Sequence, residues 1–466
     1  MIKHIDPILK EIASFFNADG KEIYLVGGAV RDMLRGEKIH DWDLTTNALP
    51  EEVTAIMKKA GAKVIPTGIK HGTVTVFYKR NNAEVTTFRT ESGYSDGRRP
   101  DQVSFTADIN DDLSRRDFTM NAIALRLPDG KLIDPFGGEK DIKAKIIRCV
   151  RDASERFNED GLRPMRAVRF ASQLGFEIKK NTLDAVGGTL SVCAKVSMER
   201  VRDEIEKILK SPVPSIGFRL MEKTGLLKLF LNELEICRGI EQKGFHEFDV
   251  LDHSLLACDY AAKKDFSLDV RLAALFHDVG KPSVRELDAS GGGIHAVWTF
   301  YRHEEVSANM SRKILNRLRF PNAVIEKVCH LIKEHMFHYT DDWSDAAVRR
   351  FIARAGENNL EDIYSLRRAD IYGFSGRESN RNSYISESNS LLRLIERVSN
   401  VMSAKRAFSL KDLAVNGRDL IQIGIEPGKT IGIILKELLE TALDDPAQNE
   451  KERLLEIAGK IYGKRV

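Results

Sequence analysis

The chain has 466 residues, of which 42% are hydrophobic and 30% are charged, and its formal net charge is only +3. This length predicts about two to four domains, and this composition is typical of a soluble globular protein. The small net charge excludes a uniformly basic nucleic-acid-binding protein, so any contact with RNA must come from local basic patches.

The five cysteines are scattered along the chain and form no Cys-x-x-Cys pair. This usage predicts reduced thiols and a cytoplasmic location, and it argues against a disulfide framework or a structural zinc site. No apolar run approaches the ~20 residues that a membrane-spanning helix needs, so no membrane association is expected.

Residues 23–45 carry the first informative pattern, in which an apolar strand, a Gly-Gly turn, a short helix and a second strand follow one another. Asp41 and Asp43 lie on the second strand and share one face, because side chains alternate along a strand. Gly27 and Gly28 allow the backbone to approach a phosphate closely, and a helix N-terminus favours anions. Two carboxylates beside such a phosphate cradle are what Mg²⁺-dependent phosphoryl transfer requires.

Strands alternate with helices up to about residue 150, and residues 74–78 and 84–89 are predicted strands. The stretch 91–100 contains two glycines and a proline, which predicts a mobile loop. Further along, helical periodicity predicts helices over residues 163–174 and 198–209.

Asp160 and Arg163 are three residues apart, so we expect them on one helix face. Arg166 and Arg169 continue this face at the same spacing. An aspartate accepts hydrogen bonds and a guanidinium donates them. Cytosine and adenine both present an exocyclic amine beside a ring-nitrogen acceptor, whereas uracil and guanine present a carbonyl. From the residues alone, an ordinary ion pair on a solvated basic face is the commoner interpretation, and a reader of nucleotide bases is the alternative.

The C-terminal part begins with a polar stretch, residues 375–390, which we predict to be a linker. Helical periodicity returns over residues 410–458 and includes a Gly-rich turn at residues 424–432. A turn that opens a helix can hold a backbone phosphate of RNA, although an ordinary connection between two helices has the same pattern.

Residues 23–45, 114–122, 134–138 and 159–163 together resemble the class II tRNA nucleotidyltransferases and bacterial poly(A) polymerases. The resemblance implies a multidomain fold: a polymerase-β-like α/β nucleotidyltransferase head, followed by a mostly α-helical neck, body and tail. The expected domains are the head over residues 1–150, a neck with the base-reading motif over 151–245, a body over 246–375, and a tRNA-binding tail over 376–466.

The resemblance also implies site residues. Asp41 and Asp43 would be catalytic and would hold Mg²⁺. The nucleotide-binding residues would be Gly28, Arg31, Arg116, Asp160, Arg163, Arg166 and Arg169.

A second site is indicated by His277-Asp278, which resembles the signature of HD phosphohydrolases. The resemblance adds His253 and Asp370 as metal ligands, and His303 and His335 extend the set. Mixed histidine and carboxylate ligands suit Mn, Ni, Co, Fe or Zn. The expected chemistry is hydrolysis of phosphate esters, including 2′,3′-cyclic phosphates at RNA ends. A lone histidine of this kind is more often a surface residue or a hydrogen-bonded core residue.

The function implied by the resemblance is addition of CCA to the tRNA 3′ end from CTP and ATP, with a secondary hydrolase. Residues 62–72 lack the arginine-rich motif of bacterial poly(A) polymerases, and residues 89–100 resemble the flexible loop of CCA-adding and A-adding enzymes. Addition of A alone and polyadenylation remain alternatives within the class. An HD phosphohydrolase with an RNA-binding head and a non-catalytic RNA-binding module are alternatives from other classes.

Overall fold

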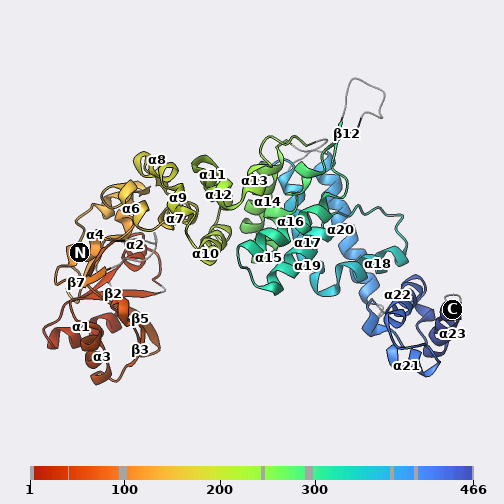
Figure 1. Cartoon of the computed structure of the whole chain (residues 1–466), viewed down its shortest axis with the longest axis horizontal. Coiled ribbons are helices and arrows are strands. Elements are labelled where there is room, and N and C mark those ends of the chain that lie inside the picture. Colours follow the sequence, from red (N-terminus) through yellow and green to blue (C-terminus); the bar gives the residue numbers. More distant parts are fainter. Residues whose placement is uncertain are drawn as a thin grey trace. The chain divides into compact units, whose positions relative to one another are not determined.

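The structure, a computed structural model, describes residues 5–39, 41–93, 102–242, 247–288, 297–377, 382–403 and 408–463. The chain forms two compact units, Met1–Asn232 and Glu233–Val466 (Figure 1). All five cysteines are buried and none forms a disulfide. Within the described ranges, no helix combines the length and apolar character that crossing a membrane requires.

The first unit is built on a seven-stranded mixed sheet with the strand order β3-β4-β5-β2-β1-β8-β9. Strands β2 and β5 are parallel, and all other neighbours are antiparallel. All four residues of β1 are buried, because helices cover this part of the sheet. The strands are β1 (Ile23–Val26), β2 (Trp42–Thr46), β3 (Lys63–Gly68), β4 (Thr73–Tyr78), β5 (Asn81–Thr87), β8 (Ala124–Leu127) and β9 (Leu132–Ile133).

Short helices and one hairpin complete the sheet region. The helices are α1 (Pro7–Ala18), α2 (Gly28–Leu34), α3 (Pro50–Lys59), α4 (Ile109–Ser114) and α5 (Gly138–Ala144). Strands β6 (Arg89–Ser92) and β7 (Gln102–Phe105) pair as an antiparallel hairpin. The prediction of a loop over residues 91–100 is therefore wrong for residues 91 and 92, which alternate as a strand. Residues 94–100 lie outside the described ranges.

The rest of the first unit is helical. Its helices are α6 (Ala153–Glu159), α7 (Arg163–Leu174), α8 (Lys180–Gly188), α9 (Leu190–Cys193), α10 (Met198–Leu209), α11 (Pro214–Thr224) and α12 (Leu226–Phe230), and β10 (Ile146–Ile147) pairs with β11 (Glu177–Ile178). Helices α7 and α10 confirm the two helices predicted from periodicity, with the same first and last residues.

The expectation that Asp160 and Arg163 share one helix is wrong. Asp160 has extended backbone after the end of α6, and Arg163 is the first residue of α7. Pro164 has no backbone N–H to donate to the Asp160 carbonyl, so a helix cannot run through this point with all its hydrogen bonds. A Cβ atom on Gly161 would lie 2.5 Å from the carbonyl oxygen of Val192, so only glycine fits this tight connection.

The second unit is mainly helical, and α14, α15, α16, α17 and α19 pack together at its centre. Its elements are α13 (Asn232–Glu235), which spans the boundary, then α14 (Val250–Lys263), α15 (Leu268–Phe276), β12 (Glu286–Asp288), β13 (Val297–Thr299), α16 (His303–Arg317), α17 (Asn322–Glu334), α18 (Asp345–Ala355) and α19 (Leu360–Gly373). The tail follows with α20 (Asn382–Ser403), α21 (Gly417–Gln422), α22 (Lys429–Asp444) and α23 (Lys451–Gly463).

Helix α20 corrects the predicted linker at residues 375–390, because its first turns lie inside that stretch. The helix packs on α18 and α19; Leu391, Leu394 and Val398 are buried, whereas Ser386 and Asn389 are exposed. Composition identified the polar side of the helix and missed its spaced apolar residues.

Candidate active site and metal centre

A polar cleft with a volume of about 700 Å³ opens in the first unit. Its lining brings together all nine residues that the sequence indicated for nucleotide or Mg²⁺ binding. They are Gly28, Arg31, Asp41, Asp43, Arg116, Asp160, Arg163, Arg166 and Arg169. Residues far apart in the sequence therefore meet in one cavity, which the sequence alone could not show.

Two aspartates lie beside the glycine turn of this cleft. Asp41 directly precedes β2 and Asp43 is its second residue, and both are exposed. Gly27 has φ +68°, and a Cβ atom there would lie 3.1 Å from Nη1 of Arg116 and 3.7 Å from Oδ2 of Asp43. Glu84 is the register partner of Asp43 on the neighbouring strand. Desolvation by the surrounding protein raises the pKa of Asp43, and the negative charges of Glu84 and Asp41 raise it further, while Arg116 opposes this.

This arrangement fits a hard divalent cation. Carboxylate oxygens are the ligands that Mg²⁺ prefers, and a cation would offset the burial and the neighbouring negative charges that raise the pKa of Asp43. Asp41 and Asp43 are therefore the residues that could hold Mg²⁺ in this cleft.

Arg31 and Arg116 are held by carboxylates behind the cleft. Arg31 is buried and donates to both carboxylate oxygens of Asp32, at 2.9 and 2.8 Å, and to Oδ1 of Asn121 at 2.9 Å. Arg116 donates to Asp112, a fully buried carboxylate, at 3.2 Å. Both guanidinium groups are thereby fixed before any ligand arrives.

Asp160 and Arg163 do not pair with each other. Oδ2 of Asp160 accepts from Arg200 of α10 at 2.9 Å, and Oδ1 accepts from the backbone N–H of Leu162 at 3.0 Å. Arg163 is buried and forms an ion pair with Glu159 at 2.6 Å. Both side chains still line the cleft, so each remains available to a ligand as a separate group.

Arg166 and Arg169 are ion-paired and are not an open basic stripe. Arg166 pairs with Asp117 at 2.6 Å and Arg169 with Glu204 at 2.5 Å. Burial alone would raise the pKa of Asp117, but Arg166 and hydrogen bonds to its carboxylate lower this pKa to about 2. The two arginines therefore stand in fixed positions at the cleft wall.

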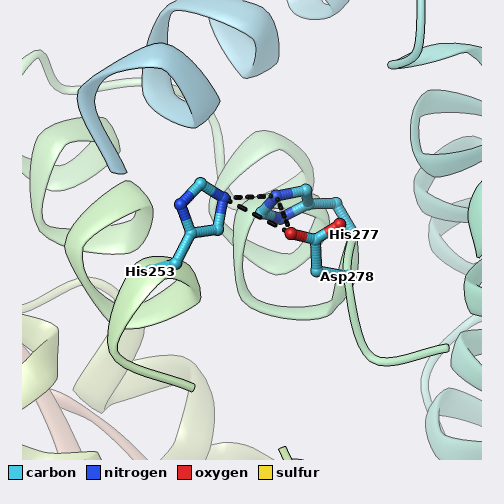
Figure 2. A group of neighbouring side chains, drawn as sticks. All are labelled: His253, His277 and Asp278. Carbon is cyan, nitrogen blue, oxygen red and sulfur yellow. Dashed lines mark hydrogen bonds and ion pairs between the residues drawn. The ribbon is translucent and has the colours of Figure 1, made fainter. Parts of the chain in front are cut away.

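The second unit contains a buried cluster that unites all six residues proposed for a metal site. His253 comes from α14, His277-Asp278 follows α15, His303 opens α16, His335 follows α17 and Asp370 lies in α19. Figure 2 shows His253, His277 and Asp278 pointing toward one another. Nε2 of His253 lies 3.1 Å from Nε2 of His277 and 3.4 Å from Oδ2 of Asp278.

The remaining members close the cluster from two sides. Oδ1 of Asp370 lies 3.1 Å from Nε2 of His253 and 3.5 Å from Nε2 of His277. Oδ1 of Asp278 lies 3.2 Å from Nε2 of His303, whose ring centroid is 5.4 Å from that of His335. Two groups could each hold an ion, His253 with His277 and Asp278, and Asp278 with His303 and His335, so Asp278 is common to both.

The imidazole rings are oriented as metal ligands are. Nδ1 of His277, His303 and His335 lies 2.6–2.9 Å from a backbone carbonyl three residues earlier. A proton on Nδ1 leaves the Nε2 lone pair facing the cluster. Burial and the positive charges of neighbouring histidines lower the pKa of His335 to about 3. Against the effect of burial, Asp278 and Asp370 raise the pKa of His277 to about 10. A buried cluster of this kind fits a transition metal with nitrogen and oxygen ligands.

Several functional neighbours were missed from the sequence. Arg200 and Glu204 on α10 orient Asp160 and Arg169, Asp117 orients Arg166, and Lys281 lies 2.6 Å from Asp278. The charged residues of the 198–209 helix matched ordinary surface positions, so only the packing of α10 on α7 could identify them.

Comparison with known proteins places the chain in a family. Residues 23–148 match the model "Poly A polymerase head domain", residues 175–237 match "Probable RNA and SrmB- binding site of polymerase A", and residues 295–458 match "tRNA nucleotidyltransferase domain 2". The CCA-adding enzyme of Pediococcus pentosaceus is 34% identical over 444 residues, which are 95% of this chain and 94% of that protein. The chain belongs to the family of CCA-adding enzymes.

Two further comparisons define the extent of the likeness. The CCA-adding enzyme of Lactobacillus johnsonii is 49% identical over 220 residues, so the match spans 47% of this chain and only 53% of that relative. The crystal structure of the Bacillus stearothermophilus CCA-adding enzyme in complex with CTP has a TM-score of 0.72 and 30% identity, and the match covers 99% of both chains. This likeness confirms the expected polymerase-β-like head followed by a mostly helical, multidomain body.

Proposed function

We propose that the chain adds CCA to the 3′ end of tRNA from CTP and ATP and releases pyrophosphate, without a nucleic-acid template. The observation that carries this proposal is one cleft of the first unit, in which two accessible aspartates, seven arginines and the carboxylate of Asp160, which can accept from a base, line the same cavity. The relative from Bacillus stearothermophilus was solved in complex with CTP, which fits a cleft of this composition.

Each group in the cleft has a chemical task in this proposal. Asp41 and Asp43 would hold Mg²⁺, which lowers the pKa of an attacking 3′-hydroxyl and stabilises a pyrophosphate leaving group. The backbone at Gly28 and the guanidinium of Arg116 would oppose the triphosphate charge. Asp160 would accept a hydrogen bond from the exocyclic amine common to cytosine and adenine, and would repel the carbonyl of uracil.

The tail would bind the body of the tRNA, as part of a head, neck, body and tail arrangement with boundaries near residues 150, 245 and 375. Support comes from the turn before α22, where Gly424, Gly428 and Lys429 are exposed at the N-terminus of a 16-residue helix. Such a helix end attracts phosphate. A cytoplasmic location agrees with the five cysteines, none of which forms a disulfide.

The decisive experiment uses tRNA transcripts that end before CCA, after C and after CC, each with CTP, ATP or both. Full CCA addition requires C incorporation into the first two transcripts and A incorporation only after CC. Incorporation of A alone, into the CC transcript only, would identify an A-adding enzyme, and long A tails would identify a poly(A) polymerase.

A second candidate function, hydrolysis of phosphate esters, is favoured by the buried six-residue cluster of the second unit. Its four imidazoles and two carboxylates could hold Mn, Ni, Co, Fe or Zn, which supplies a nucleophilic hydroxide at neutral pH. Lys281, with Nζ 2.6 Å from Oδ2 of Asp278, places a positive charge beside the cluster that a phosphate oxygen could meet. We infer a phosphoesterase acting on RNA ends or nucleotides.

A further inference from the structure

The side chain of Phe170 lies at the centre of three cleft arginines. The guanidinium carbon of Arg169 is 3.7 Å from the centroid of its ring, that of Arg31 is 5.2 Å away and that of Arg166 is 5.5 Å away. Phe170 is 5% exposed and lines the cleft. Phe118 packs edge-on against it at a centroid distance of 5.8 Å and holds the ring in place.

Three guanidinium groups around one point repel each other. Asp32 pairs with Arg31 from the same helix, α2, whereas Asp117 and Glu204 pair with Arg166 and Arg169 from other segments of the chain. The ring contributes what these carboxylates cannot, because its negative face attracts cations without accepting their hydrogen bonds. The ring takes up none of the N–H donors, so the N–H groups that are not bound to these carboxylates, to Asn121 or to Gln173 can still meet phosphate oxygens.

We propose that Phe170 is a positioning residue for the triphosphate of the incoming nucleotide. It gathers Arg31, Arg166 and Arg169 into one array, so that binding a triphosphate requires no rearrangement of these side chains. Pre-ordered charges bind more tightly than charges that must first be collected. This inference rests on the proposed nucleotide site, and it assigns to Phe170 a role in triphosphate affinity that is independent of which base is bound.

The test compares Phe170→Leu, which keeps an apolar side chain without a ring, with Phe170→Tyr, which keeps the ring. The measurement is the dissociation constant of the full-length protein for CTP, ATP and inorganic tripolyphosphate, by calorimetry. Phe170→Leu should weaken all three about fivefold to tenfold, the loss expected for one or two cation–π contacts. Phe170→Tyr should restore most of the affinity.

Phe157→Leu is the matched control, because Phe157 is a fully buried phenylalanine of the same unit that does not line the cleft. It should lower the melting temperature without weakening tripolyphosphate binding. Equal affinities in wild type and Phe170→Leu would overturn the inference, as would affinity losses that follow the melting temperature in both leucine variants. Absence of CTP and tripolyphosphate binding in the wild type would instead contradict the proposed nucleotide site itself.

Discussion

Arg200 donates a hydrogen bond to the carboxylate of Asp160 across 2.9 Å, from a helix that begins almost forty residues later than this aspartate. The backbone N–H of Leu162 occupies the other carboxylate oxygen at 3.0 Å. Two donors on opposite oxygens fix the plane of the carboxylate, so the lone pairs that remain point in defined directions. In the proposed site, base selection would therefore depend on α10 as well as on the connection between α6 and α7.

The first prediction concerns this pair. Asp160→Ala should allow UTP and GTP to be incorporated more readily relative to CTP and ATP, because it removes the acceptor and the repulsion of a carbonyl. The lost charged hydrogen bond corresponds to about 1.5–3 kcal/mol. Arg200→Met should shift selectivity in the same direction by a smaller factor. The measurement is kcat/KM for all four nucleotides on tRNA lacking CCA.

Arg202→Met is the control for this prediction, since Arg202 lies on the same helix and pairs with Asp203 and Glu206. It should leave base selection unchanged. A common decrease for all four nucleotides in Asp160→Ala would mean that this carboxylate supports the site without reading the base.

The second prediction concerns the paired aspartates. Asp41→Ala and Asp43→Ala should each abolish nucleotide addition in Mg²⁺ while leaving the fold intact, because both side chains are exposed in the cleft. Addition is followed on tRNA lacking CCA, and melting temperature is followed in parallel. Asp129→Asn, an exposed acid of the same unit that pairs with Arg126, should retain full activity. Wild-type rates in either aspartate variant would remove these residues from the mechanism.

The third prediction concerns pH. The pKa of Asp117 is lowered from 3.8 to about 2, with Arg166 as the main cause opposing burial. A lowered folded-state pKa stabilises the protein fully above pH ~4, and this stabilisation disappears as the pH falls toward 2. Asp117→Asn should therefore cost about 2 kcal/mol of local stability at pH 6 and little near pH 2.

Hydrogen exchange of the α7 amides, measured in the full chain between pH 6 and pH 2.5 and corrected for intrinsic exchange rates, reports this quantity. Asp184→Asn breaks an exposed ion pair with Lys180 in the same unit and should change protection by less than about 1 kcal/mol. A difference between wild type and Asp117→Asn that stays constant with pH would show that the Asp117 charge is not its source.

The sequence predicted those elements whose bounds depend only on residues of the same segment. Helix α7 has the bounds that its periodic apolar residues predict, and the structure adds that Gly175, with φ +65°, ends it. The pairing of Asp160 with Arg200 could not be predicted, because spacing along one segment says nothing about a helix that packs across it. Glu84 lies beside Asp43 because β2 and β5 pair in parallel register. This neighbour likewise could not be predicted from the spacing of residues along one segment.

The last prediction concerns the proposed metal site of the second unit. Asp278→Asn should reduce metal content at least tenfold and abolish phosphoester hydrolysis, because both possible ion groups include Asp278. Nucleotide addition should be unaffected, since none of the cleft residues belongs to this cluster. Metal content is measured by mass spectrometry after dialysis against Mn²⁺ or Ni²⁺. Hydrolysis is measured with a 2′,3′-cyclic nucleotide as the substrate.

His330→Ala is the control, because Nε2 of His330 lies 2.7 Å from the carbonyl oxygen of Ala355, outside the cluster. Unchanged metal content in Asp278→Asn would show that the six residues are a hydrogen-bonded core instead.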